Sequence, residues 1–383
     1  MNLIQRTTLV AGAIGLLAAC GGSAPEAATP PAASATAAPA ASSAAAPAAS
    51  SAAPIASAAP KAEPAADPIR AAAKKVIACA GWSELSVPWE CADLKAFDEL
   101  GALQDGAGDK TLVEMLADPE PKMVALGARG LRVNGRKFRE DAALSEKIVA
   151  RLEAGKDDES VLDNLATVAG AIDAEKTKLG PRLLDLAKKI PNTTVRASFI
   201  SAGQFHNSDL LYPVTSELAR SSDNQELRRT AISAFWTGTP SGKSEEVCKL
   251  WVSIGQDPKT PDGLAAQAVD YAAWTPTTCD KQYDAIAKLL EKHLKGKVEE
   301  SSWVLAAAHL VGQDKLAPAL KKKVLGLLKT VANDTKNGPN ARVFAIDGLV
   351  KADPAGAKAL LAKLSKDKDE YVSKHAAETA AGK

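Results

Sequence analysis

Residues 223–235 read Asp-Asn-Gln-Glu-Leu-Arg-Arg-Thr-Ala-Ile-Ser-Ala-Phe. The pattern of this segment is the main indication of the fold. In it, the apolar residue Leu227 is followed by an arginine, and the small residues Ala231 and Ala234 stand four and seven positions later. These spacings place the residues on one face of an α-helix. Because small side chains let a neighbouring helix approach closely, the stretch predicts a helix that packs against other helices.

The same pattern recurs along the chain, clearly at Ala341-Arg342 with Ala345 and Gly348, and more loosely elsewhere. Eight copies begin at residues 123, 161, 195, 227, 264, 303, 341 and 372. Amphipathic segments lie between them, at 144–152, 181–190, 212–219, 245–254, 283–294, 315–331 and 357–364. This is the period of a helix-turn-helix repeat, whose pairs bury their apolar faces only by stacking. We therefore predict an all-α fold, an α-solenoid of about eight stacked helix pairs.

Three segments carry a family resemblance: Asp-Pro-Glu-Pro-Lys-Met-Val at 118–124, Asp-Asn-Gln-Glu-Leu-Arg-Arg at 223–229 and Asp-Lys-Asp-Glu-Tyr-Val-Ser-Lys-His-Ala at 367–376. They resemble HEAT repeats, especially the short bacterial type, in which an aspartate opens the second helix and a valine-arginine pair begins it. The resemblance covers residues 105–383 and implies a HEAT-like solenoid. Val124 and Ser373 depart from the family pattern because each stands where the arginine belongs.

The N-terminal end of the chain has the pattern of an export signal. Arg6 precedes an apolar run at 9–19 that is shorter than the roughly 20 residues of a membrane span. The run ends in Leu-Ala-Ala-Cys at 17–20, which resembles the lipobox of bacterial lipoproteins. The resemblance implies that residues 1–19 are removed and that Cys20 is lipidated. Gly21, where an inner-membrane protein of that class has aspartate, implies an outer-membrane protein in the cell envelope, facing the periplasm. The alternative is an ordinary signal peptide with a chance cysteine.

Residues 20–66 form the predicted tether between Cys20 and the repeats. Of the 46 residues at 21–66, 38 are Ala, Pro or Ser, and there is no aromatic side chain. Such a segment cannot bury enough apolar surface to offset its ordering entropy, so we expect a disordered spacer. Residues 67–104 match neither the tether nor the repeat, and contain Trp82 and Trp89. They predict an N-terminal helical cap before the repeat domain at 105–383.

Four cysteines remain besides Cys20: Cys79, Cys91, Cys248 and Cys279. Export to an oxidising compartment favours disulfides, and four cysteines allow three connectivities. The local connectivity, Cys79 with Cys91 and Cys248 with Cys279, suits a repeat protein whose contacts are between near neighbours. A metal site is the competing interpretation, but the cysteines lack Cys-x-x-Cys or Cys/His ligand spacing.

The sequence offers little support for catalysis. Gly238-Thr-Pro-Ser-Gly-Lys-Ser244 is similar to a phosphate-binding loop, but it has one residue too few between its glycines and follows a helix. We interpret it as a turn between helices. Four histidines are scattered through different repeats: His206, His293, His309 and His375. We expect no catalytic residue, no metal and no cofactor. The net charge of +1 gives no reason to expect binding to nucleic acid or to an anionic surface.

Three aromatic residues are the candidates for partner binding. Phe205, Trp236 and Trp274 stand nine or ten positions after their repeat starts, and equivalent positions of a solenoid form a line. Aromatic anchors beside polar groups suit a protein or peptide partner. The alternative is that these rings fill the core where each helix meets its turn.

The sequence thus predicts a membrane-anchored, periplasm-facing scaffold for a protein or peptide, without catalytic activity. Two other functions stay open. One is an enzyme accessory or lyase-like subunit, because some relatives of these repeats serve as lyase subunits. The other is a purely structural envelope lipoprotein.

Overall fold

The computed structural model describes residues 67–83, 85–102, 106–134, 137–274 and 279–382. The expected signal peptide, Cys20 and the tether lie outside the described residues. The described part of the unit from Pro64 to Lys383 is helical. In its described part the strand-like pairing is confined to one isolated bridge between Ser83 and Ser86. The predicted all-α fold is confirmed.

Eight helix pairs follow a two-helix cap in the described part of the chain. The cap consists of α2 (Pro68–Ile77) and α3 (Ala92–Gly101). The pairs are α4 (Ala107–Met115) with α5 (Pro121–Asn134), α6 (Ala142–Ala154) with α7 (Glu159–Gly170), α9 (Gly180–Lys189) with α10 (Thr193–His206), α11 (Ser208–Ser221) with α12 (Gln225–Thr237), α13 (Ser244–Gln256) with α14 (Asp262–Trp274), α15 (Tyr283–His293) with α16 (Ser302–Val311), α17 (Pro318–Asn333) with α18 (Pro339–Ala352), and α19 (Pro354–Leu364) with α20 (Glu370–Ala380). Short helical turns η1 (Phe138–Glu140), α8 (Ala174–Thr177) and η2 (Asp280–Gln282) lie in the connections.

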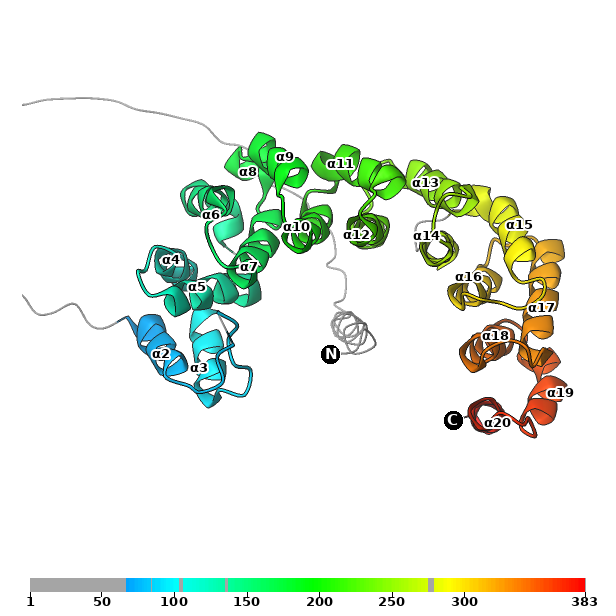
Figure 1. Cartoon of the computed structure of the whole chain (residues 1–383). Helices are drawn as coiled ribbons and strands as arrows, with labels where there is room; N and C mark the ends of the chain where they lie inside the picture. The colour runs from blue at the N-terminus through cyan, green and yellow to red at the C-terminus, as the bar shows by residue number, and fades with distance from the viewer. Residues whose placement is uncertain (1–66, 84, 103–105, 135–136, 275–278, 383) are drawn as a thin grey trace, which may run out of the picture. The chain divides into compact units, whose positions relative to one another are not determined.

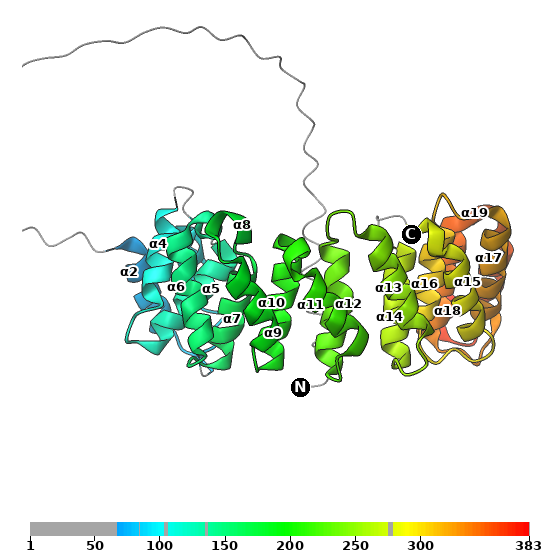
Figure 2. The same ribbon diagram turned by 90° about the horizontal axis from the view of Figure 1, so that it is seen from above.

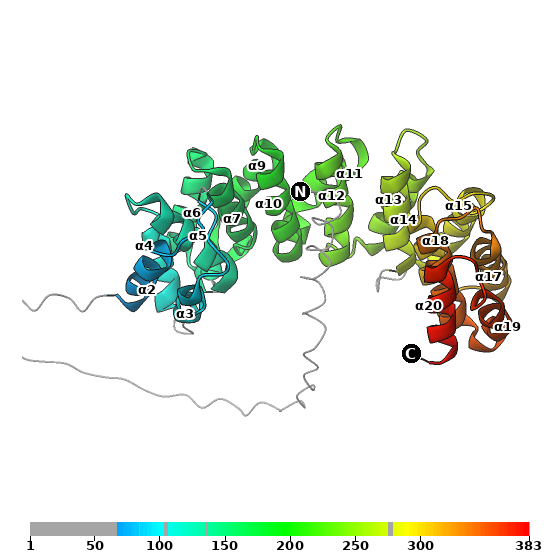
Figure 3. The ribbon, with the colours of Figure 1, turned by 60° about the horizontal axis from the view of Figure 1, so that its bottom comes forward.

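Within this unit the pairs stack into two parallel rows that curve together (Figure 1). The second helices of the pairs, from α5 to α20, lie on the concave side and form the inner row. The first helices, from α4 to α19, form the outer row. Seen from above and from below, neighbouring pairs remain side by side from α4 to α20 (Figure 2 and Figure 3). The predicted α-solenoid is confirmed, and each predicted repeat start lies one or two residues inside an inner-row helix.

Small residues let neighbouring helices of the inner row approach closely. Gly348 lies on α18 and faces Ala308 on α16. A Cβ atom added at Gly348 would lie 2.6 Å from the Cβ of Ala308 and 2.8 Å from its Cα. Since real Cβ contacts are wider than this, the two helices pack at a distance that only glycine permits here.

The repeated arginine joins the two helices of its pair. Arg196, Arg228 and Arg342 each donate from Nε to a carbonyl near the end of the preceding outer helix. The acceptors are Ala187 at 2.7 Å, Ala219 at 3.0 Å and Ala332 at 3.0 Å. These carbonyls belong to the last turn of a helix, where backbone acceptors lack intrahelical partners. The arginine, near the start of the second helix of a pair, therefore caps the C-terminal end of the first helix by a hydrogen bond.

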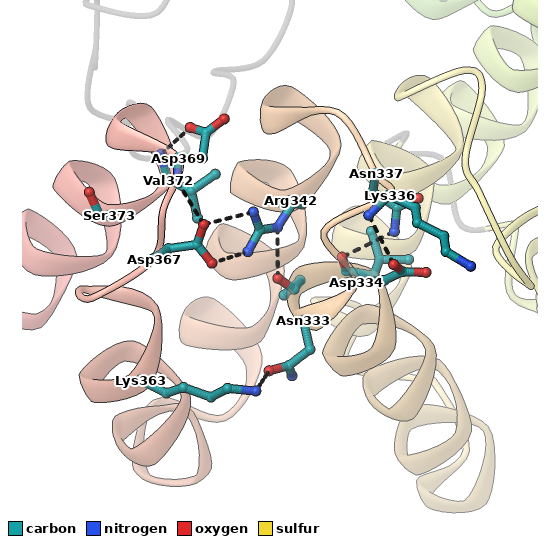
Figure 4. A network of polar contacts seen from close by, with 12 residues as sticks. Asn333, Asp334, Lys336, Asn337, Arg342, Lys363, Asp367, Asp369, Val372 and Ser373 are labelled. Carbon is teal, nitrogen blue, oxygen red and sulfur yellow. Dashed lines mark hydrogen bonds and ion pairs between the residues drawn. The ribbon is translucent and has the colours of Figure 1, made fainter.

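Two of these arginines also reach the following pair. The guanidinium of Arg228 donates to Thr260 at 2.7 Å. The guanidinium of Arg342 donates through both terminal nitrogens to the carboxylate of Asp367, at 3.1 and 2.5 Å (Figure 4). Asp367 in turn accepts from the backbone N–H of Asp369 at 3.0 Å, which shapes the turn before α20. One side chain thus connects α17, α18 and the turn before the last helix.

Both predicted local disulfides are present. Cys79 pairs with Cys91 in the cap, with Cα atoms 5.9 Å apart. Cys248 on α13 pairs with Cys279, with Cα atoms 5.5 Å apart, and both side chains are buried. The second bridge connects α13 to the segment that leads into α15, so it ties one pair to the next.

Candidate binding surface

Trp236, Trp274 and His309 stack on one another across three helices of the inner row. The centroids of Trp236 on α12 and Trp274 on α14 are 5.0 Å apart, with ring planes at 25°. The centroids of Trp274 and His309 on α16 are 4.8 Å apart, with planes at 12°. Tyr271 on α14 stacks beside Trp236 with centroids 6.1 Å apart. We call these four residues the aromatic ladder.

The ladder presents ring edges to solvent. Helices α12 and α16 flank α14 on opposite sides (Figure 1). Because Trp236 and His309 both stack on Trp274 and come from these two helices, we infer that they cover opposite faces of its ring. Trp274 is nevertheless 44% exposed, so the exposed part of this side chain is mainly its edge. Ring edges carry the positive side of the aromatic quadrupole and suit carbonyl or carboxylate oxygens.

A buried carboxylate holds the end of the ladder in place. His309 Nδ1 lies 2.7 Å from the Oδ1 of Asp270, which is itself buried on α14. Burial raises the pKa of Asp270, and the hydrogen bond with His309 opposes this effect. The pair fixes the plane of the imidazole against Trp274 and leaves the other ring nitrogen, Nε2, outside this bond.

Polar side chains next to the ladder are also held by hydrogen bonds. The amide of Gln267 donates to the Tyr271 hydroxyl at 3.2 Å. Gln313 donates to the carbonyl of Ala273 at 2.7 Å and accepts from Tyr283 at 3.3 Å. Among described residues the indole nitrogen of Trp236 has no hydrogen-bond partner, although it is buried. The ladder is therefore a rigid, partly polar surface.

Phe205, the third predicted aromatic, lies apart from the ladder. Its side chain is 62% exposed on α10, and its ring makes an edge contact with His206. The preceding residue, Gln204, is buried and binds the carbonyl of Gly238 at 2.7 Å and the hydroxyl of Thr215 at 2.9 Å. The structure thus brings Trp236 and Trp274 together and leaves Phe205 as a separate exposed ring one helix away.

Polar bridges between neighbouring helices continue the inner row on both sides of the ladder. Toward the N-terminal end, Arg132 on α5 lies 3.3 Å from Asp163 on α7, which also binds Ser198 on α10. Toward the C-terminal end, Asp347 on α18 lies 2.7 Å from Nε2 of His375 on α20. The inner row therefore joins a mainly polar surface to an aromatic centre.

The histidine pairs could not be found by local motif searches. His309 and His375 have carboxylate partners 39 and 28 residues earlier in the chain. His293 lies 3.4 Å from Asp262, which is 31 residues earlier. These separations are about one repeat, so only the stacked arrangement brings the partners together.

The phosphate-loop-like segment at 238–244 is a turn between α12 and α13, as predicted. Lys243, which would bind phosphate in such a loop, lies 2.7 Å from the carboxylate of Glu246. The backbone N–H of Ser241 donates to Asp209 at 2.7 Å. Both groups are therefore occupied within the protein.

A possible ligand cluster for a metal in the described part of the chain consists of Cys79, Cys91 and Asp93. Because Cys79 and Cys91 form a disulfide, neither offers a thiolate. This cluster is consequently part of the cap and not a metal centre.

Comparison with protein-family models and with curated proteins finds no match for this chain. Among the described residues, none of the helices has the length and apolar character that crossing a bilayer requires. A function must therefore be argued from the geometry of the inner row.

Proposed function

We propose that this chain is a scaffold that holds a protein or peptide against the inner row, with the aromatic ladder as its central contact. The observation that carries the proposal is the exposed edge of Trp274, fixed between Trp236 and His309. Aromatic residues at the centre of a contact supply much of the binding energy of protein interfaces. A ring that is already held by its neighbours loses little side-chain entropy on binding.

The chemistry of the surface supports a peptide-like partner. Ring edges and the amide of Gln267 offer donors and positive potential, whereas the Nε2 of His309 lies outside the bond with Asp270 and can form a further hydrogen bond. A polypeptide backbone has carbonyl acceptors and N–H donors that match both kinds of group. Phe205 offers a second apolar anchor along the inner row.

We further propose that the scaffold is a lipoprotein of the cell envelope with HEAT-like repeats. The lipobox-like segment ending at Cys20 supports the anchor, and its placement facing the periplasm follows from the same resemblance. The Asp367-Arg342 contact supports the repeat type, because the aspartate and the arginine are the residues on which the resemblance rests. The scaffold would need no cofactor and carry out no reaction.

Site-specific cross-linking in intact cells tests the binding proposal. A photoreactive residue replaces Thr237, which is exposed beside Trp236 on α12. We expect it to form discrete adducts, and we expect Trp274→Ala to reduce their yield at least about fivefold, the loss of a modest interface contact. Trp89→Ala is the matched control, since Trp89 is 82% exposed in the cap, far from α14 in the chain. Unchanged adducts in Trp274→Ala, at equal protein level, would remove the ladder from the proposal.

A further inference from the structure

The C-terminal part of the solenoid carries an excess of positive charge. Residues 315–383 contain 14 Lys or Arg and 7 Asp or Glu, a net charge of +7. Residues 1–314 contain 33 Lys or Arg and 39 Asp or Glu, a net charge of −6. The balanced charge of the whole chain therefore conceals two regions of opposite sign.

This excess lies on the outer row. Helix α17 contains four lysines and α19 contains two, and neither helix contains an acidic or aromatic residue. The two helices follow one another in the outer row at the C-terminal end of the solenoid (Figure 1). Both helices belong to the outer row, whereas the aromatic ladder lies on the inner row.

Most of these lysines lack a carboxylate partner. Lys323 is paired with Glu291 at 2.6 Å, and Lys363 donates to Asn333 at 2.7 Å (Figure 4). Five exposed lysines on α17, on α19 and in the turn after α19 have no ion pair among the described residues: Lys322, Lys329, Lys358, Lys366 and Lys368. We call these five residues the basic face.

The nearby aspartates are occupied elsewhere. Asp367 binds Arg342, whereas Asp353 accepts from the backbone of Gly356 at the start of α19. Asp369 caps α20 through the N–H of Val372, and Asp334 accepts from the N–H of Lys336. These carboxylates stabilise turns and helix ends, so the positive potential of the basic face is left for an external anion.

We propose that the basic face docks on the anionic surface of a phospholipid bilayer. Clusters of about four to eight lysines attract anionic lipid surfaces, and lysine binds phosphate as a point charge. Binding to single-stranded nucleic acid uses aromatic rings for base stacking, and α17 and α19 have none. The choice of a bilayer as the source of the phosphate groups rests in part on the proposed lipid anchor, which would hold the solenoid near a membrane.

Docking through the outer row would leave the inner row accessible. Helices α17 and α19, which carry Lys322, Lys329 and Lys358, belong to the outer row, whereas the aromatic ladder belongs to the inner row. One molecule could therefore contact lipid through α17 and α19 while a peptide lies on α12, α14 and α16. Docking through the basic face would thus orient the proposed scaffold on the membrane with its inner row accessible.

Vesicle binding by charge-reversal variants tests this inference. The full chain, made without acylation, is mixed with vesicles of phosphatidylcholine or of phosphatidylcholine with about one third phosphatidylglycerol at low ionic strength, where surface charges act most strongly. The triple variant Lys322→Glu/Lys329→Glu/Lys358→Glu should show a weaker preference for anionic over neutral vesicles. We expect the ratio of the two affinities to fall at least about fivefold. Residues 1–66 are identical in all variants, so their own affinity for vesicles cancels from the comparison.

The control variant changes the net charge by the same amount elsewhere on the solenoid. Lys259, Lys288 and Lys292 are exposed, have no ion pair among the described residues, and precede α17. Their reversal to glutamate should alter the preference by less than about twofold. Equal losses of this preference in both variants, or no loss in the first variant, would overturn the proposal. The proposal would also be overturned if the wild-type chain bound an oligonucleotide and showed no preference for anionic vesicles. None of these outcomes bears on Trp274, so the inner-row proposal is tested separately.

Discussion

Arg342 and Asp367 form the best-enclosed ion pair of the described chain, and their side chains are only 3% and 11% exposed. Arg342 also binds the carbonyl of Ala332, so its charge is fully engaged by the protein. Removing one partner of such a pair leaves the other buried without compensation, which costs more than the pair itself contributes. The pair therefore makes the last turn and α20 dependent on one carboxylate.

We predict that Asp367→Asn lowers the free energy of unfolding by about 3 kcal/mol at neutral pH. The hydrogen bonds from Arg342 hold the pKa of Asp367 below its ordinary range. A carboxylate with a lowered folded-state pKa contributes stability that is present above its unfolded pKa and is lost as the pH falls through the folded value. The difference between the variant and the wild type should therefore shrink below about pH 4.

Urea unfolding at neutral and acid pH, with hydrogen exchange of α20, measures this difference. Glu370→Gln is the control, because Glu370 is exposed and precedes the buried positions of α20. A stability loss in Asp367→Asn that stays constant down to pH 2 would show that the carboxylate charge is not its cause.

Glycine at two helical positions gives a direct test of close packing. A Cβ at Gly348 would meet Ala308 at 2.6 Å, whereas at Gly326 on α17 nothing lies within 4 Å. We predict that Gly348→Ala destabilises the protein by about 1–3 kcal/mol through overpacking. Gly326→Ala should stabilise it by about 0.5–1 kcal/mol, because alanine is the better helix former. Thermal unfolding of the two variants measures both effects. Equal shifts in Tm would mean that the α16–α18 contact is looser than described.

At the scale of the elements, the sequence predicted the helices well because their signals are local. Leu227, Ala231 and Ala234 define a buried face within eight residues, and the structure buries all three. Aspartate and asparagine caps mark several helix starts, such as Asn224, which accepts from the N–H of Leu227 at 3.1 Å. Such signals need no knowledge of distant residues.

The candidate site was less predictable because its contacts join different repeats. The sequence placed Trp236 and Trp274 at equivalent positions, and these rings stack. It did not predict His309 or Asp270, since they stand one turn away from those positions and pair across 39 residues. Phe205 shares the equivalent position but not the stack, and its ring contacts His206 instead. Side-chain partners between helices depend on the angle and height at which pairs stack, which the repeat pattern leaves undetermined.

At the scale of the whole solenoid, the buried apolar side chains form two clusters. One extends from α2 to α11 and includes Ala234 on α12, and the other extends from the end of α11 to α20. Leu218 on α11 contacts both clusters. The stability of a repeat protein is a sum of contributions from its local units and their interfaces. Two separate core clusters therefore predict two units that unfold separately.

We predict two cooperative units that meet near α11. Leu126→Ala, in the first cluster, should accelerate hydrogen exchange from α2 to α10 and leave α14–α20 unchanged. Trp251→Ala, in the second cluster, should do the reverse, with a stability loss of about 3–5 kcal/mol in that unit because its ring is fully buried. Exchange that rises uniformly along the chain in either variant would show a single cooperative unit.

The proposed function requires that a protein or peptide partner bind to the inner row. Photoreactive residues placed singly along both rows in intact cells test it most directly, at Thr230, Gln267 and Leu305 on the inner row and at Lys249 and Lys288 on the outer row. We predict discrete adducts from the inner-row positions, strongest at Gln267 beside the ladder, and none from the two outer-row positions. Adducts that form equally from both rows, or only from the outer row, would contradict binding of a partner to the inner row.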